Sequence, residues 1–324
     1  MPTVAGKSGD KVVTEQIPLE GFAHPQGTDF HRPGLFRRAS DRATACTRLV
    51  DTAGRYVRLA IESNGIRPVT IFTLGRFSLL TNGQPADLGR KVPKRPLELL
   101  KAIIAQGGRE ISLSRLTLLL WPDVDGDKAM RSFDTNLHRL RKILNDDRAL
   151  VLRDGKLSLD ARYCWVDVWM FERLLGEARR LLRNTADSNQ VYLLEGLTEN
   201  LLALYQDHFL IREEVTDWSV SMRERLRSKF IHHLTEVGRF WETQGYWEQA
   251  IECYQKGIDV DDLVEVFYQR LMSCYLNTNR LSEGMSIYRR CCQTLSIMLS
   301  LQPEPETESL YLALRNARPG KQSA

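Results

Sequence analysis

The sequence of 324 residues lacks any apolar run long enough to span a bilayer, and its first residues lack the apolar core of a signal peptide. We therefore expect a cytoplasmic protein with no membrane partner. The six cysteines include no C-x-x-C pair, so neither a zinc site nor a disulfide framework is indicated and we expect reduced thiols. His208, His232 and His233 stand apart from any cysteine or carboxylate at ligand spacing, which argues against a metal site.

Signatures of catalysis are also missing. Gly6-Lys7-Ser8 is similar to the end of a phosphate-binding loop, but that motif requires a glycine where this chain has Met1, and no strand precedes it. No serine lies in the context of a nucleophile elbow. We therefore expect neither an enzyme nor a bound cofactor.

Charge is distributed unevenly along the chain. Residues 67–160 hold 17 Lys and Arg against 11 Asp and Glu, a net charge of +6, whereas residues 161–318 hold 18 against 23, a net charge of −5. A basic half followed by an acidic half predicts that the first meets a polyanion and the second does not.

The first half has the element order of a winged helix-turn-helix. Residues 1–40 are polar and rich in Gly and Pro, which predicts disorder, and one amphipathic helix is expected at residues 43–62. Hydrophobic periodicity then predicts two strands, three helices and a hairpin, at residues 69–74, 77–80, 93–106, 112–121, 127–144 and 150–159. Turn signals lie at Asn82-Gly83, Gly107-Gly108 and Asp154-Gly155, and Ser112 is the expected cap of the second helix.

After Trp165 the pattern is helical almost to the end, and it contains a repeat. An aromatic, a turn residue, a small residue and a second aromatic recur 34 residues later, as Trp241, Gly245, Ala250 and Tyr254 and then Tyr275, Asn279, Gly284 and Tyr288. This period is typical of tetratricopeptide repeats. Further helices are expected at residues 191–205, 215–230 and 308–316.

The predicted fold is an α+β winged helix-turn-helix followed by an all-α tetratricopeptide-like helical repeat domain. The expected ranges are an N-terminal segment, the winged helix, the helical domain and a tail, at residues 1–66, 67–164, 165–318 and 319–324. The tryptophans of the second half are expected to pack helices rather than stack on bases.

The third helix of the winged region carries the predicted chemistry. On a helical wheel its apolar residues form one stripe, made of Met130, Phe133, Leu137, Leu140 and Leu144. The opposite face and its flanks carry Arg131, Thr135, His138 and Lys142, with Asp134, Arg139 and Arg141 beside them. A major groove accepts such a helix, in which Arg reads guanine, Asp accepts from cytosine and Thr contacts a base edge or a thymine methyl. Lys and the remaining Arg residues suit phosphates.

The hairpin supports this interpretation over a merely solvated helix face. Arg153 and Lys156 bracket its tip, where a winged helix touches the neighbouring DNA backbone. Lys91, Lys94 and Arg95 precede the first helix and add cations. Three basic features in one compact fold favour double-stranded DNA as the partner.

These residues resemble a known pairing of domains. The segment from Arg131 to Leu144 resembles the recognition helix of the response-regulator winged helices of the OmpR/PhoB class, and Leu120-Trp121-Pro122 resembles the end of that class's second helix. Residues 204–210, 217–218 and 223–226, followed by the repeat pair and residues 303–308, resemble the bacterial transcriptional activator domain. This pairing is found in the Streptomyces antibiotic regulatory protein family.

The resemblance implies roles for individual residues. Asp134 and Arg139 would approach base edges, and backbone contacts would come from Arg131, Thr135, His138 and Arg141. Family members often carry Arg at the position of His138, where a neutral imidazole weakens a phosphate contact. The loop at residues 122–126 corresponds to the segment that contacts RNA polymerase in relatives.

The sequence therefore predicts a sequence-specific DNA-binding regulator that recruits or stabilises RNA polymerase. Its helical repeats would hold a partner, either a second copy of the chain or a sensor protein. The main alternative is an interaction scaffold whose winged helix no longer reads DNA. A nucleotide-dependent enzyme is a third class, and the missing glycine argues against it.

Overall fold

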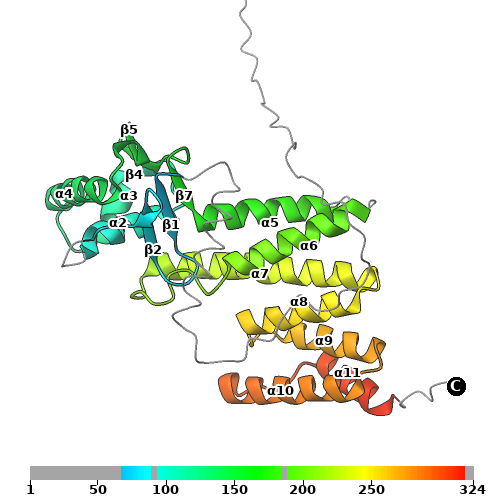
Figure 1. Cartoon of the computed structure of the whole chain (residues 1–324). Helices are drawn as coiled ribbons and strands as arrows, with labels where there is room; N and C mark the ends of the chain where they lie inside the picture. Colours follow the sequence, from blue (N-terminus) through cyan, green and yellow to red (C-terminus); the bar gives the residue numbers. More distant parts are fainter. Residues whose placement is uncertain (1–66, 89–92, 184–187, 318–324) are drawn as a thin grey trace, which may run out of the picture. The chain divides into compact units, whose positions relative to one another are not determined.

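The computed structural model describes residues 67–88, 93–183 and 188–317. The segment at residues 1–66, with the helix expected in it, lies outside the described residues, as do Lys91, Cys46 and the tail. A small α+β region is followed by a series of helices, as Figure 1 shows. This confirms the predicted fold class. Among the described residues, no helix combines the length and apolarity that a membrane crossing requires.

The first sheet has four strands in the order β3-β2-β1-β7. They span Val69–Phe72 (β1), Ser78–Thr81 (β2), Gln84–Pro85 (β3) and Cys164–Val166 (β7). Strand β2 pairs antiparallel with β1 and, across the Asn82-Gly83 turn, with β3. The φ angles of this turn are 50° and 77°. Two consecutive positive φ angles are those of the hairpin turn that Asn-Gly favours, so the turn prediction is confirmed.

Three helices form the body of the winged region, α2 (Lys94–Ala105), α3 (Leu113–Leu120) and α4 (Gly126–Leu144). The hydroxyl of Ser112 accepts a hydrogen bond from the Arg115 amide at 3.3 Å, which confirms the predicted cap. Helix α2 is buried on several sides because it packs against α3, α4 and a helix of the second half.

The second sheet holds the wing. Its order is β4-β6-β5, and its strands span Ile111–Ser112 (β4), Leu150–Arg153 (β5) and Lys156–Leu159 (β6), after a short 3-10 turn at Asp147–Ala149. Asp154 and Gly155 have φ angles of 48° and 70°, so the predicted tight hairpin is confirmed. The short strand β4 pairs with β6 and was not expected from the sequence.

The second half is a stack of helices in which α5 packs against α6 and α7, and each helix from α7 onward packs against the next. They span Asp167–Arg183 (α5), Ser188–Leu204 (α6), Asp217–Thr243 (α7), Trp247–Val260 (α8), Glu265–Asn277 (α9), Leu281–Leu299 (α10) and Pro305–Asn316 (α11). Helix α7 runs 13 residues past the end expected for it, because its apolar pattern continues to Trp241.

The repeat residues behave as the 34-residue period predicts. Gly245 and Asn279 both have positive φ, 76° and 56°, at the turns between paired helices. Ala250 is fully buried. A Cβ on Gly284 would lie 2.7 Å from a methyl carbon of Leu314, so only glycine permits this approach of α10 to α11.

Hydrogen bonds join the two halves directly. Asp167, the first residue of α5, is fully buried and its carboxylate accepts from the Thr73 amide, the Thr73 hydroxyl at 2.7 Å and the Leu74 amide at 2.7 Å. Burial raises the pKa of Asp167, and these hydrogen bonds act in the opposite direction. Beyond β1, the Thr73 carbonyl accepts from the Leu210 amide at 2.8 Å, and the Gly75 amide donates to the His208 carbonyl at 3.2 Å.

Strand β7 spans the expected domain boundary at residue 164 and pairs in parallel with β1. The helical domain was expected to begin at residue 165, but Trp165 lies in this strand. A three-residue strand carries no periodicity of its own, so only its pairing with β1 identifies it. The domain ranges themselves stay a prediction.

Candidate nucleic-acid interface

Helix α4 is held in place by its apolar face. Phe133, Leu137, Leu140 and Leu144 are buried, as predicted, and Met130 is partly buried against them. The helix packs against α2 and α3 on this side. Its orientation is therefore fixed by the core, which leaves the opposite side free for a ligand.

The outward face of α4 carries the predicted polar residues. Arg141 is half-buried. The other six are exposed: Arg131, Asp134, Thr135, His138, Arg139 and Lys142. Within the described ranges, none of these side chains forms an ion pair. A row of unneutralised cations on one helix face is the electrostatic arrangement that a polyanion requires.

The hydroxyl of Thr135 is already used as a donor within α4. It donates a hydrogen bond to the Arg131 carbonyl at 2.9 Å. Because the hydroxyl proton is used inside the helix, the side chain presents an acceptor oxygen and a methyl group to a ligand.

Asn136 is a residue of α4 that the sequence analysis missed. It is buried, and its amide nitrogen donates to the Ser132 carbonyl at 2.7 Å. Its side-chain oxygen has no hydrogen-bond partner in the described part of the chain. An unsatisfied buried acceptor costs about 1–3 kcal/mol, and polarity alone gave no signal that this Asn would face inward.

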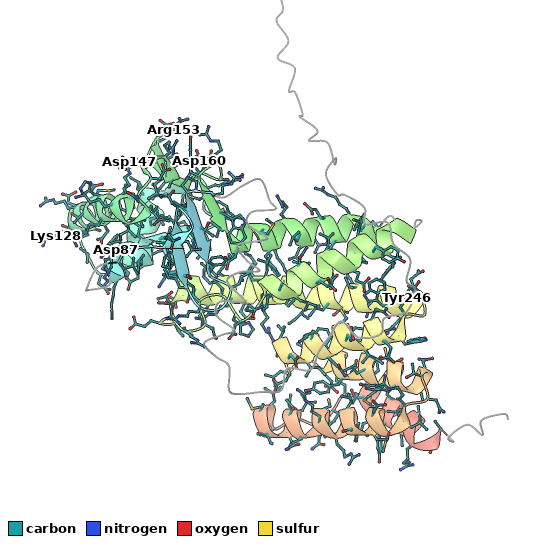
Figure 2. All side chains as sticks on the ribbon, viewed as in Figure 1. Asp87, Lys128, Asp147, Arg153, Asp160 and Tyr246 are labelled. Carbon is teal, nitrogen blue, oxygen red and sulfur yellow. The ribbon has the colours of Figure 1, made fainter. Side chains whose placement is uncertain are left out.

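The wing contributes the other two predicted residues. Arg153 and Lys156 face each other across the turn between β5 and β6, and both are exposed. Arg153 lies at the outer end of this hairpin in Figure 2. The Lys156 ammonium lies 3.8 Å from the Glu110 carboxylate, whereas Arg153 has no such neighbour among the described residues. The charge of Lys156 is therefore partly neutralised by Glu110, whereas the charge of Arg153 is not.

Apolar residues are exposed beside the loop between α3 and α4. Leu118 is 68% exposed and Val124 is 39% exposed. An exposed large apolar side chain next to a basic surface is a candidate protein contact.

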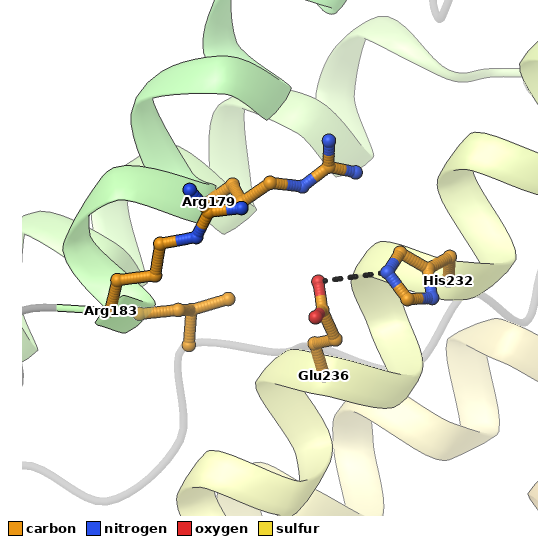
Figure 3. A pocket seen from close by; sticks show the side chains of 5 residues that line it. Arg179, Arg183, His232 and Glu236 are labelled. Carbon is orange, nitrogen blue, oxygen red and sulfur yellow. Dashed lines mark ion pairs between the residues drawn. The ribbon is translucent and has the colours of Figure 1, made fainter.

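A second polar cluster lies between α5 and α7. Arg179, Arg183, His232 and Glu236 line a hollow there, and His232 lies 3.2 Å from Glu236, as Figure 3 shows. In the described part of the chain, no three metal-ligating side chains come together. The neighbouring His233 is buried, and burial, with smaller effects of Arg179 and His232, lowers its pKa to about 4.

The remaining polar candidates belong to the core. The five described cysteines are free thiols. Burial raises the pKa of Cys164, Cys253, Cys274 and Cys291 to about 12, so these thiols are unreactive. The tryptophans of the second half are buried or partly buried in helix packing, as expected.

Comparison with known proteins points to one family. Residues 166–315 match the family model of the bacterial transcriptional activator domain. Among solved structures, the chain is similar to Mycobacterium tuberculosis EmbR in complex with a low affinity phosphopeptide, with a TM-score of 0.59 and 17% sequence identity. The alignment covers 79% of this chain and 67% of that chain. No curated protein matches the chain. At this identity the structural likeness concerns the fold.

Proposed function

We propose that this chain, whose residues 166–315 match the bacterial transcriptional activator domain, is a transcriptional regulator that binds double-stranded DNA sequence-specifically through α4 and the β5–β6 wing. The observation that carries this proposal is the outward face of α4, whose cations are exposed and without acidic partners among the described residues. No bond-making chemistry is part of the proposal.

Two residues of α4 are the proposed base readers. Arg139 suits the paired acceptors of guanine, and Asp134 suits the amino group of cytosine. Thr135 lies beside Asp134 and offers an acceptor and a methyl group, because its proton is held by Arg131. It can therefore pack against a thymine methyl or accept from a base amino group.

The other basic residues are the proposed phosphate contacts. Arg131, His138, Arg141 and Lys142 lie along the same helix, and Arg153 and Lys156 lie on the wing. Contacts from two separate elements would fix the register of α4 in the groove. His138 contributes less than an arginine would, because an imidazole offers fewer donors to a phosphate than the fork of a guanidinium.

The scaffold alternative has less support. A winged helix that docks protein through α4 would present large apolar residues on its outward face, and the exposed residues there are polar. In the described part of the winged region, the exposed large apolar residues lie instead at Leu118 and Val124, beside the α3–α4 loop, and at Leu152 on β5. We assign Leu118 and Val124 to a contact with RNA polymerase, by the family resemblance of the α3–α4 loop.

The helical domain offers a surface for a second copy of the chain or for a sensor protein. Ile297 and Met298, in the last turn of α10, are 69% and 62% exposed, and Leu301, just after this helix, is 56% exposed. Tandem binding of two joined protomers would raise their effective concentration on DNA.

Selection from a pool of random double-stranded DNA tests this function with the full chain. The wild-type protein should enrich one sequence motif. Arg139→Ala should lose preference at one base position and about 1–3 kcal/mol of binding free energy. Arg289→Ala, a change at an exposed arginine of α10, serves as the matched control and should retain both motif and affinity. No enriched motif, or an Arg139→Ala protein that selects as the wild type does, would refute the proposed DNA reading.

A further inference from the structure

A groove of about 550 Å³ lies where the winged region meets the helical domain. One wall comes from α2 and the end of α3, and the other comes from residues 210–218, which lead into α7. This volume is in the range of about 300–1,000 Å³ that small-molecule sites occupy.

The floor of the groove is apolar. Leu97 and Leu120 of the winged region and Leu210 and Trp218 of the helical domain line it, and all four are buried. An indole and three leucines from two parts of the fold form the kind of concave apolar surface that holds the body of an organic ligand.

Charged residues on the walls are mostly paired. The Lys101 ammonium lies 2.7 Å from the Glu213 carboxylate and 4.4 Å from the centre of the Phe77 ring. Arg95 and Glu98 form another pair at 2.8 Å. The charges of these two ion pairs cancel, so the four residues add no net charge to the groove.

Three further charges line the groove without an ion-pair partner among the described residues: Lys94, Arg212 and Glu214. Two cations against one carboxylate leave an excess of one positive charge. The groove therefore favours a ligand that has one acidic group on an apolar body.

We infer that this groove binds a small amphipathic acid, and that the bound acid regulates the protein. The regulatory part rests on the proposed DNA-binding function, whereas the binding site does not. The ligand would contact Leu119 and Leu120, directly before the α3–α4 loop, and α2, which packs against α4. A molecule held by both walls stabilises the arrangement of the two halves that it fits best and so shifts the affinity for DNA.

The probe for a first test is 8-anilinonaphthalene-1-sulfonate, an aromatic body with one sulfonate, titrated into the full chain. Energy transfer from Trp218 reports binding in the groove, because Trp218 lies on its floor. The expected result is saturable transfer that is reduced in Trp218→Phe, since the remaining tryptophans still act as donors. Transfer that is unchanged in Trp218→Phe would show that the probe binds elsewhere and would overturn the site.

Charge reversal tests the recognition of the acidic group. Arg212→Glu removes an exposed cation from the rim and should weaken probe binding about tenfold or more, as expected for a lost charge-assisted hydrogen bond. Arg289→Glu, a reversal at an exposed arginine of α10 outside the groove, should bind the probe as the wild type does. Equal affinities in the two variants would overturn the assignment.

The regulatory part is tested by the affinity for the selected DNA motif with and without saturating probe. A change in the wild type that is absent in Arg212→Glu supports regulation through the groove. An unchanged affinity, with the probe bound, overturns regulation but leaves the site. A protein that binds the probe as expected and selects no DNA motif would refute the proposed function alone.

Discussion

Replacing Asp167 by alanine should lower the free energy of unfolding of the protein, because this carboxylate joins the winged region to the helical domain. Its oxygens accept from the amides of Thr73 and Leu74, at the end of β1, where Thr73 is fully buried and Leu74 is 5% exposed. The alanine variant leaves both amides without an acceptor, and neither can turn toward water.

The expected loss follows from these two donors. Each buried unsatisfied amide costs about 1–3 kcal/mol, which gives about 2–6 kcal/mol for the pair. Removing a fully buried carboxylate recovers part of this, since burial disfavours the charge. We therefore expect a net loss of about 3 kcal/mol, a large share of the about 5–15 kcal/mol that stabilises a typical domain.

Urea unfolding of the full chain, followed by tryptophan fluorescence, measures this loss. Trp165 and Trp169 flank Asp167 and report on its surroundings. The matched control is Glu177→Ala on the same helix, whose exposed carboxylate lies 3.6 Å from Arg173 and should contribute less than about 1 kcal/mol. If Asp167→Ala and Glu177→Ala unfold at the same urea concentration, the reasoning about the junction is wrong.

Further predictions concern the wing, a buried histidine and the loop. Arg153→Ala should reduce the slope of the logarithm of the DNA-binding constant against the logarithm of salt concentration by about one. Lys156→Ala should reduce this slope by less, because Glu110 already neutralises part of the charge of Lys156. Equal slopes in the two variants would contradict this. His233 has a pKa of about 4 when folded against 6.5 ordinarily, so stability is full above pH 6.5 and falls by about 3 kcal/mol as the pH drops to 4. Urea melts across this range should show a smaller pH dependence in His233→Gln. Leu118→Ser with Val124→Ser should keep DNA affinity but lower transcription by RNA polymerase in vitro, and unchanged transcription would refute that contact.

Local signals made much of the winged region predictable. Asn82-Gly83 and Asp154-Gly155 require backbone angles that few other pairs adopt, so each turn could be placed from two residues. The outward face of α4 followed from helical periodicity, because its apolar stripe is unbroken. The repeat was found because Gly245 and Asn279 occupy the same left-handed turn position.

Contacts between distant segments were not predictable in this way. Strand β7 pairs with β1 across some 95 residues of sequence and has only three residues, which is too short for a periodic pattern. The role of Asp167 depends on the same long-range pairing. The inward direction of Asn136 depends on how α4 meets its neighbours, which the sequence of one helix does not specify.

The hydrogen bonds between Thr73 and Leu210 and between Gly75 and His208 have a consequence for protein engineering. Consider a chimera in which the winged region is exchanged at the end of β7. The new region must supply backbone groups that pair with residues 208–210, and its first strand must end where the Asp167 carboxylate can accept from its amides. A graft chosen by sequence boundaries alone would leave these groups without partners. The transferable cassette is therefore the winged region together with Asp167 and the 208–210 segment, two pieces that are separate in the gene and continuous in the protein.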